Sequence, residues 1–397
     1  MAGLLSVAAA RDAIAAAVRP LPHEPVALAD ALGRVLAEDV VAAGDVPPFA
    51  NAAMDGYAVR AGTGGRTLRV VGESRAGAPP DVAVSEGDAV RISTGAPMPE
   101  GADGVLAVER VEVADGLVTL GADVAPGLNV REPGEDVRRG DVVLVAGTRL
   151  GPAELGVAVS AGRGAVECAR RPRVSVVATG DELAPPGAPL RPGQIHNSNA
   201  VTLRALAAGA GAVARVVPGV PDTIEATEAA LRGALEGADV VLVSGGVSVG
   251  PHDHVKPALE RLGAQERFWR VALRPGKPTW FGVRGEALVF GLPGNPVSAM
   301  VTFALFARPA LAAMQGEPFA AERRTALLAE DVPRRAERDE AVRVRLRTGD
   351  DGVLRAEPTG PQGSHQLRSM LGADGLAIVE AGEGHLPAGT PVAVEPL

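Results

Sequence analysis

The chain has 397 residues, of which 46% are hydrophobic and 22% are charged, and its formal net charge is −9. This is more residues than a typical domain with one hydrophobic core contains, and it predicts roughly two to four domains. The acidic balance argues against a nucleic-acid-binding protein, which normally carries a basic face. The single cysteine, Cys168, excludes an internal disulfide and a multi-cysteine metal site.

The N-terminal segment predicts helices. Residues 4–19 carry apolar side chains at helical spacing and stop before Pro20, which is typical of an amphipathic helix, and a second short helix is expected over 27–36. The first residues lack the charged segment of a signal peptide. We find no apolar run of the roughly 18–20 residues that span a bilayer, and therefore expect a cytosolic protein without a membrane span.

The next region has the pattern of short strands separated by Gly, Pro and Asp clusters, for example at 67–71, 89–92 and 142–145. A helix is expected over 152–162, beginning at Gly151-Pro152. We therefore expect a β-rich inserted domain over 49–145, flanked by a helical and linker domain formed by 1–48 and 146–170.

From 171 to 317 the pattern changes to strands alternating with helices. The expected strands include 174–178, 213–217 and 240–243, and the expected helices are 198–208, 222–236, 252–262 and 296–313. Such alternation predicts a three-layer α/β domain with a mostly parallel sheet, whose ligand binds at the carboxyl ends of the strands. The tail, 318–397, returns to short strands, and we expect a small β-barrel there, with a sandwich as the alternative. The fold class is therefore multidomain, α/β plus β.

Two glycine-rich junctions between a strand and a helix are candidate anion-binding turns. They combine bare backbone N–H groups with a helix N-terminus, the geometry that binds phosphate groups. The first contributes Gly245, Gly246, Ser248 and Gly250, and the second contributes Gly294, Asn295, Pro296 and Ser298. A tight turn and a well-capped helix remain the alternative interpretations.

Three cations lie between these junctions, at Arg270, Arg274 and Lys277. If 267–273 is a strand, Arg270 and Arg274 share one face and can hold phosphate oxygens. Solvated surface charge is the alternative.

Carboxylates follow several of the predicted strands, notably Glu182, Asp222 and Asp253. The carboxyl ends of parallel strands meet at one edge, and carboxylate oxygens beside phosphates are suitable ligands for Mg²⁺. Helix caps or surface acids are the alternative. His252 and His254 are two residues apart and diverge on a helix, which disfavours a transition-metal site.

Seven motifs in this order resemble the MoeA family of molybdopterin molybdenumtransferases, a module that also forms the E domain of gephyrin. The resemblance covers essentially the whole chain. The matching stretches are MDGYAVR (54–60), STGAPMPEGAD (93–103), REPGEDVRRGD (131–141), ATGDEL (178–183), SGGVSVGPHDH (244–254), RPGKP (274–278) and LPGNPVS (292–298).

The resemblance implies a homodimer of four-domain subunits that inserts molybdate into adenylylated molybdopterin, with Mg²⁺, and releases AMP. It also implies transient contact with the adenylyltransferase that supplies this substrate. Carried over position by position, it assigns functional roles to Asp55, Thr94, Asp136, Glu182, Asp222, Asp253, Arg270, Arg274, Arg343 and Ser364, the last two as candidates for binding molybdate. Arg270 and Arg274 replace the lysines expected of the family, and Ala52 replaces a serine.

Two other functional classes compete with this interpretation. A nucleotide-handling hydrolase on the same α/β module is disfavoured because the MDGYA and STGAP motifs lie outside that module. A scaffold or a carrier of the finished cofactor is the second, and a gephyrin-like scaffold would be expected to have a further α/β domain and a long linker.

Overall fold

The structure is a computed structural model that describes residues 4–78, 81–247, 253–319 and 323–397. It divides into two compact units, each described separately. One comprises Met1–Glu24, Gly33–Ala37 and Glu167–Leu397, and the other comprises Pro25–Leu32 and Glu38–Val166.

The second unit is built mainly from strands. Its largest sheet has the order β7-β4-β6-β5-β9-β8. These strands are β4 (Gly56–Val59), β5 (Thr67–Ser74), β6 (Asp88–Ile92), β7 (Gly104–Ala107), β8 (Val111–Ala114) and β9 (Leu117–Leu120). Alternate side chains such as Tyr57, Leu68 and Val118 are buried together on one face, as strand periodicity predicts.

Smaller elements complete this unit. They are β2 (Val40–Val41) paired with β11 (Val142–Leu144), β3 (Asn51–Ala52) paired with β10 (Val130–Arg131), and helix α2 (Pro152–Ser160). The second helix expected over 27–36 is wrong. Only Leu28–Asp30 forms a short 3-10 turn, and Leu36 instead makes a β-bridge to Cys168, a long-range pairing that helical periodicity does not reveal.

The first unit contains the predicted α/β domain. Its central sheet has the order β16-β13-β17-β21-β20-β18. The parallel strands are β13 (Arg173–Ala178), β16 (Val213–Val216), β17 (Val240–Ser244) and β21 (Ala287–Leu292), and the antiparallel ones are β18 (Gln265–Trp269) and β20 (Trp280–Arg284).

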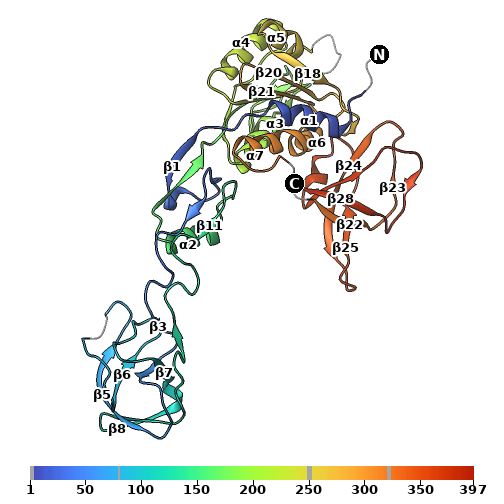
Figure 1. The fold of residues 1–397 in the computed structure, drawn as a ribbon. Helices are drawn as coiled ribbons and strands as arrows, with labels where there is room; N and C mark the ends of the chain where they lie inside the picture. Colours follow the sequence, from blue (N-terminus) through green and yellow to red (C-terminus); the bar gives the residue numbers. More distant parts are fainter. Residues whose placement is uncertain (1–3, 79–80, 248–252, 320–322) are drawn as a thin grey trace. The chain divides into compact units, whose positions relative to one another are not determined.

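Helices cover both faces of this sheet because its strands are apolar on both sides. Val176 and Leu242 pack into one core with α1 (Val7–Ala17), α3 (Ser198–Gly209), α6 (Pro296–Thr302) and α7 (Arg308–Met314). Val177 and Val243 pack into the other core with α4 (Ile224–Leu235) and α5 (Val255–Arg261). Figure 1 shows these helices above and below the sheet, which confirms the three-layer architecture.

The helix expected over 296–313 is observed from Pro296 to Met314, with a π-helical stretch at Phe303–Ala307. By length and composition it could cross a membrane, being 19 residues long, but 78% of its most apolar window is buried inside the structure. Such burial is typical of the core helix of a globular domain.

The tail forms the expected barrel. Its strands are β22 (Arg324–Leu328), β24 (Asp339–Thr348), β25 (Leu354–Pro358), β26 (Gly375–Val379) and β28 (Pro391–Pro396). They pair in the order β24-β25-β22-β28-β26, and the pairing of β26 with β24 closes the ring around a core that includes Val344 and Val394. A further short strand, β19 (Leu273–Arg274), pairs in parallel with β24 and joins the barrel to the α/β domain.

Candidate functional site

The carboxyl edge of the central sheet holds a cavity of about 720 Å³. The loops that follow β13, β17 and β21 form its walls, together with the start of α3. Of the predicted site residues, those that line it are Glu182, Asp222, Gly245, Gly246, Asp253, Gly294, Asn295 and Pro296. The expectation that the ligand site lies where the parallel strands end therefore matches the position of this cavity.

The first glycine-rich junction requires glycine on steric grounds. Gly245 and Gly246 have φ angles of +92° and +65°, in the left-handed region. A Cβ atom would lie 2.9 Å from the Thr179 carbonyl oxygen at Gly245, and 2.7 Å from Val255 Cγ2 at Gly246. Ser248 and Gly250 lie outside the described residues.

The second junction starts helix α6 as predicted, with Asn295 at the N-cap position and Pro296 in the first turn. The Asn295 side chain does not cap the helix, however. Its Nδ2 donates to Ser364 Oγ in the barrel at 3.1 Å. Ser298 is 4% exposed and does not line the cavity.

Asn199 connects the two junctions. Its Nδ2 donates to Ser244 Oγ and to the Gly294 carbonyl oxygen, each at 2.7 Å. Because a carbonyl can only accept, this contact fixes which end of the amide is Nδ2. Asn199 Oδ1 is buried without a hydrogen-bond partner among the described residues.

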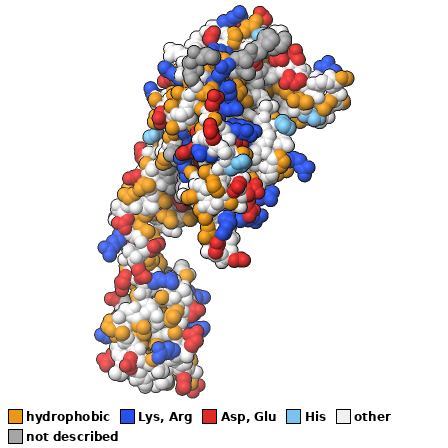
Figure 2. Space-filling model, turned by 90° about the vertical axis from the view of Figure 1, so that its right-hand side faces the viewer, with side chains coloured by type: hydrophobic (Ala, Val, Ile, Leu, Met, Phe, Trp, Pro, Cys, Tyr) orange, Lys and Arg blue, Asp and Glu red, His pale blue; other side chains and the backbone are white. Residues whose placement is uncertain are grey.

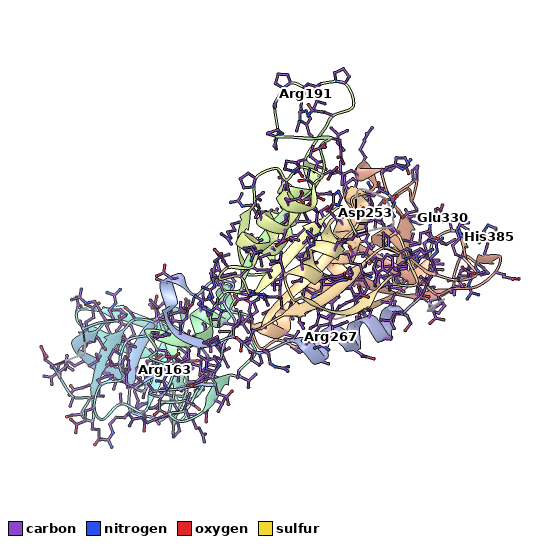
Figure 3. All side chains as sticks on the ribbon, turned by 90° about the horizontal axis from the view of Figure 1, so that it is seen from above. Arg163, Arg191, Asp253, Arg267, Glu330 and His385 are labelled. Carbon is purple, nitrogen blue, oxygen red and sulfur yellow. The ribbon has the colours of Figure 1, made fainter. Side chains whose placement is uncertain are left out.

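The acidic side chains of the cavity occupy separate loops. Asp222 and Asp181 are joined by reciprocal bonds: the Asp181 N–H donates to Asp222 Oδ2 at 3.3 Å, and the Asp222 N–H donates to Asp181 Oδ1 at 3.2 Å. Glu182 and Asp253 line the same cavity (Asp253 is labelled in Figure 3). Within the described part of the chain, no three His, Cys, Asp or Glu side chains lie close enough to hold a metal ion together.

The three cations between the junctions do not line this cavity. Segment 267–273 is not one strand, because β18 ends at Trp269 and Arg270 adopts a φ of +72°. The idea that Arg270 and Arg274 share a strand face is therefore wrong. Arg274 Nη1 lies 3.5 Å from Glu340 Oε1 in the barrel, and Lys277 is exposed.

Arg343 lies on β24 and is fully buried, at 0% exposure. Its Nε donates to Ser369 Oγ at 3.2 Å, and its Nη2 to the carbonyls of Pro361 and Gly363 at 3.4 Å. Burial lowers the pKa of Arg343 to about 10, although Glu340 opposes this shift. Its Nη1 has no hydrogen-bond partner within the described residues, so one donor of a buried cation remains unused.

Two of the three predicted residues in the other unit are in direct contact. Asp55 Oδ1 accepts from the Thr94 N–H at 2.7 Å and from Thr94 Oγ1 at 3.0 Å. These two bonds lower the pKa of the exposed Asp55 carboxyl, so it is ionised at neutral pH. Asp136 is exposed, and its backbone N–H donates to the Val46 carbonyl at 3.0 Å.

The sequence interpretation missed several cavity residues. Asn199 and, from the barrel segment, His365 were not among the predicted residues. For His365, its position directly after the predicted Ser364 was the one available signal. His196 and Thr179 also line the cavity.

Comparison with known proteins covers nearly all of the chain. Three family descriptions match in order: the MoeA N-terminal region (domain I and II) over 5–162, a probable molybdopterin binding domain over 175–313, and the MoeA C-terminal region (domain IV) over 325–397.

Individual relatives agree with this. The molybdopterin molybdenumtransferase of Haemophilus influenzae is 38% identical over 95% of this chain and 94% of its own length. That of Synechococcus elongatus is 37% identical over 99% of this chain and 100% of its own. The crystal structure of a molybdopterin biosynthesis MoeA protein from Pyrococcus horikoshii superposes with a TM-score of 0.82, at 32% identity and 99% coverage of both chains. The chain therefore belongs to the MoeA family.

Proposed function

We propose that this protein is a transferase of molybdenum cofactor biosynthesis, which inserts molybdate into adenylylated molybdopterin and releases AMP. The observation that carries the proposal is the family match along the whole chain, together with the cavity at the carboxyl edge of the sheet. Relatives with the name molybdopterin molybdenumtransferase match over nearly their full length. A hydrolase built on the α/β module alone would not need the N-terminal and C-terminal regions that also match.

The cavity suits a phosphate-bearing organic substrate. Backbone N–H groups at Gly246 and at the start of α6 can bind phosphate oxygens, because they join a glycine-rich turn to a helix N-terminus. The Gly245 N–H donates instead to the Leu292 carbonyl oxygen at 3.2 Å. A volume of about 720 Å³ lies within the range of small-molecule sites, roughly 300–1,000 Å³.

Magnesium is part of the proposal, and the donor set fits it. Glu182, Asp222 and Asp253 supply hard oxygen ligands around one cavity, although the three do not converge on a single point. Mg²⁺ commonly uses one or two carboxylates and completes its shell with water and substrate phosphates. When bound, it would offset negative charge at the phosphoanhydride. The protein's own contribution is to hold the substrate phosphates and to keep the carboxylates at the rim.

Molybdate is a tetrahedral dianion and needs cationic and hydroxyl donors. The unused Nη1 of Arg343 and the hydroxyl of Ser364 support a role for the barrel segment in binding it. Asn295 links this segment to the second glycine-rich junction through Ser364, so the oxyanion and the phosphates would bind to connected structural elements.

We also propose a cytoplasmic homodimer that contacts the adenylyltransferase transiently. Exposed valines on α2 and around β11, at Val142, Val145, Val157 and Val159, support a self-association surface, because such side chains normally lie in a core or an interface. On the face seen in Figure 2, basic and acidic side chains are interspersed, which fits a protein that does not bind nucleic acid.

One assay tests the function. Purified protein is incubated with adenylylated molybdopterin, Mg²⁺ and either molybdate or tungstate, and AMP is quantified. Oxyanion-dependent AMP release is the expected result, and its ratio between the two oxyanions gives the metal preference. Binding of finished cofactor without AMP release would instead favour a carrier.

A further inference from the structure

The cavity at the carboxyl edge of the sheet has an acidic lining, although the proposed substrate is an anion. Glu182, Asp222 and Asp253 each contribute a carboxylate to it. Among the described residues that line the cavity there is no lysine and no arginine, and the only side chains there that can carry a positive charge are His196 and His365. These two imidazoles are therefore the first candidates for side chains that bind the phosphate groups of the substrate.

The two histidines differ in how far their ring nitrogens are already used. His196 Nδ1 lies 3.3 Å from the Pro185 carbonyl oxygen and can donate to it. His365 is exposed, and within the described ranges its ring has no hydrogen-bond partner. An imidazole carries at least one N–H whether it is neutral or charged, so His365 can donate to an anion in either state.

The backbone on both sides of His365 is fixed by hydrogen bonds. On one side, the Ser364 carbonyl accepts from the Val297 N–H at 3.2 Å, and Ser364 Oγ accepts from Asn295 Nδ2 at 3.1 Å. On the other side, the Leu367 N–H donates to the His365 carbonyl at 3.1 Å. These bonds tie the barrel segment to the second glycine-rich junction, and so hold His365 at the wall of the cavity that this junction forms.

The same segment reduces the number of free backbone donors at this wall. Pro296 has no N–H, and the Val297 N–H is already bonded to Ser364. The start of α6 therefore offers fewer N–H groups than an ordinary helix N-terminus, and an imidazole N–H beside it supplies a further donor.

We propose that His365 binds the phosphate-bearing substrate directly, by donating a ring N–H to a phosphate oxygen in the cavity. The barrel thereby contributes a residue that binds the organic substrate, next to the serine proposed for molybdate. This inference rests on the function proposed above and adds a residue to its site. A hydrogen bond to a charged group is stronger than one between neutral groups, but exposure to water places this one at the weaker end of the range.

Two substitutions and one control test this role. His365→Ala removes the ring N–H, whereas His365→Gln keeps an amide N–H donor at the same position. The matched control is His385→Ala, because His385 is an exposed histidine of the same tail region, on β27 (His385–Leu386), and is not among the described residues that line the cavity (it is labelled in Figure 3).

Equilibrium binding of adenylylated molybdopterin, without oxyanion, gives Kd, and steady-state AMP release gives KM, kcat and the molybdate concentration for half-maximal rate. His365→Ala is expected to raise Kd and KM about tenfold, the loss of one hydrogen bond to a charged group, with kcat unchanged. His365→Gln should stay within about threefold of the wild type, and His385→Ala should equal it. The molybdate concentration should not change in any variant, because Ser364 and its bonds remain.

A Kd of His365→Ala within about twofold of the wild-type value would overturn the proposal, as would an equal rise in His385→Ala. A parallel rise of the molybdate concentration would also overturn it, because it would show that the substitution disturbs the whole Ser364 segment. A wild-type protein that binds the substrate but releases no AMP would overturn the proposed function instead, and the Kd values would still test His365.

Discussion

Asp239 and Asp222 lie at opposite edges of the same central sheet and have contrasting surroundings. At the amino edge, Asp239 precedes β17 and accepts two bonds from the guanidinium of Arg170, each at 2.9 Å, and one from the Arg173 N–H at 2.7 Å. At the carboxyl edge, Asp222 accepts one backbone bond and faces a cavity, and it has no ion pair within the described residues. At the amino edge the carboxylate stabilises the fold, whereas at the carboxyl edge the carboxylates are accessible to a ligand.

The contrast follows from topology. Strands of one direction bring all their following loops to the carboxyl edge, where helix N-termini also gather and favour anions or metal-bound anions. At the amino edge these features do not gather, and the carboxylate is stabilised by an ion pair with an arginine. The predictions below test whether stability and activity separate between the two edges in this way.

The largest effect is expected at the carboxyl edge. Asp253→Ala should reduce AMP release on the order of a thousandfold, because it removes a proposed ligand of the Mg²⁺ that would offset charge at the phosphoanhydride. The melting temperature should stay close to that of the wild type. Asp350→Ala, an exposed acid on a turn of the barrel, is the control for loss of one negative charge. Near-normal turnover of Asp253→Ala at saturating Mg²⁺ would remove Asp253 from the site.

A substitution at the amino edge should lower stability and leave activity unchanged. Asp239→Asn should lower the free energy of unfolding by about 2–3 kcal/mol, between the values for exposed and for buried ion pairs. The activity per folded molecule should not change. Chemical denaturation measures the first quantity, and AMP release below the melting transition measures the second.

The pH dependence of this effect has a defined sign. Burial raises the pKa of Asp239, but the bonds from Arg170 and the Arg173 N–H outweigh burial and lower it below 3.8. A carboxyl with a lowered pKa in the folded state stabilises fully above its unfolded pKa, and this stabilisation is lost as the pH falls through the folded value. The stability difference between wild type and Asp239→Asn should therefore be constant near neutral pH and shrink below about pH 4. A difference that grows on acidification would contradict this assignment.

A smaller effect is expected at Arg343. Arg343→Met keeps an unbranched side chain in the buried site and removes the unused Nη1 donor, together with the bonds from Nε and Nη2 to Ser369, Pro361 and Gly363. Thermal melting of the variant therefore accompanies the assay, so that a loss of stability is seen separately. The molybdate concentration for half-maximal rate should rise roughly tenfold to a hundredfold, the loss of one charge-assisted bond, while KM for the organic substrate stays constant. Arg347→Met, exposed on the same strand, is the control. An unchanged molybdate dependence would place the oxyanion elsewhere.

The features that the sequence predicts correctly are those set by residues close together in the chain. The strand β17 and the helix after β21 follow from local apolar periodicity, and the convergence of Asp222 and Asp253 on one cavity follows from parallel topology. The bridge of Leu36 to Cys168 and the left-handed backbone of Arg270 depend on distant partners. His365 reaches the cavity only because the barrel packs on the α/β domain, which no local pattern encodes.

The two units each contribute predicted functional acids. Asp55 is in one unit and Asp253 in the other. If the protein is the proposed homodimer and each site joins residues of both subunits, a two-fold dimer has two equivalent composite sites. Asp55→Asn and Asp253→Asn should each be inactive alone. After mixing and subunit exchange, about half of the dimers are mixed, and each mixed dimer has one site with both substitutions and one with neither.

Activity in the mixture should therefore return to roughly a quarter of the wild-type value, since one site in four is intact by this counting. The control is the same mixture without subunit exchange, which should stay inactive. If both acids served a site within one chain, every site would keep one substitution, because the two lesions are carried on different chains. Exchange verified by mass spectrometry with no recovery of AMP release would then exclude the shared site. It would leave the roles of Asp55 and Asp253 themselves intact, because each single variant tests its residue independently of which subunit supplies it.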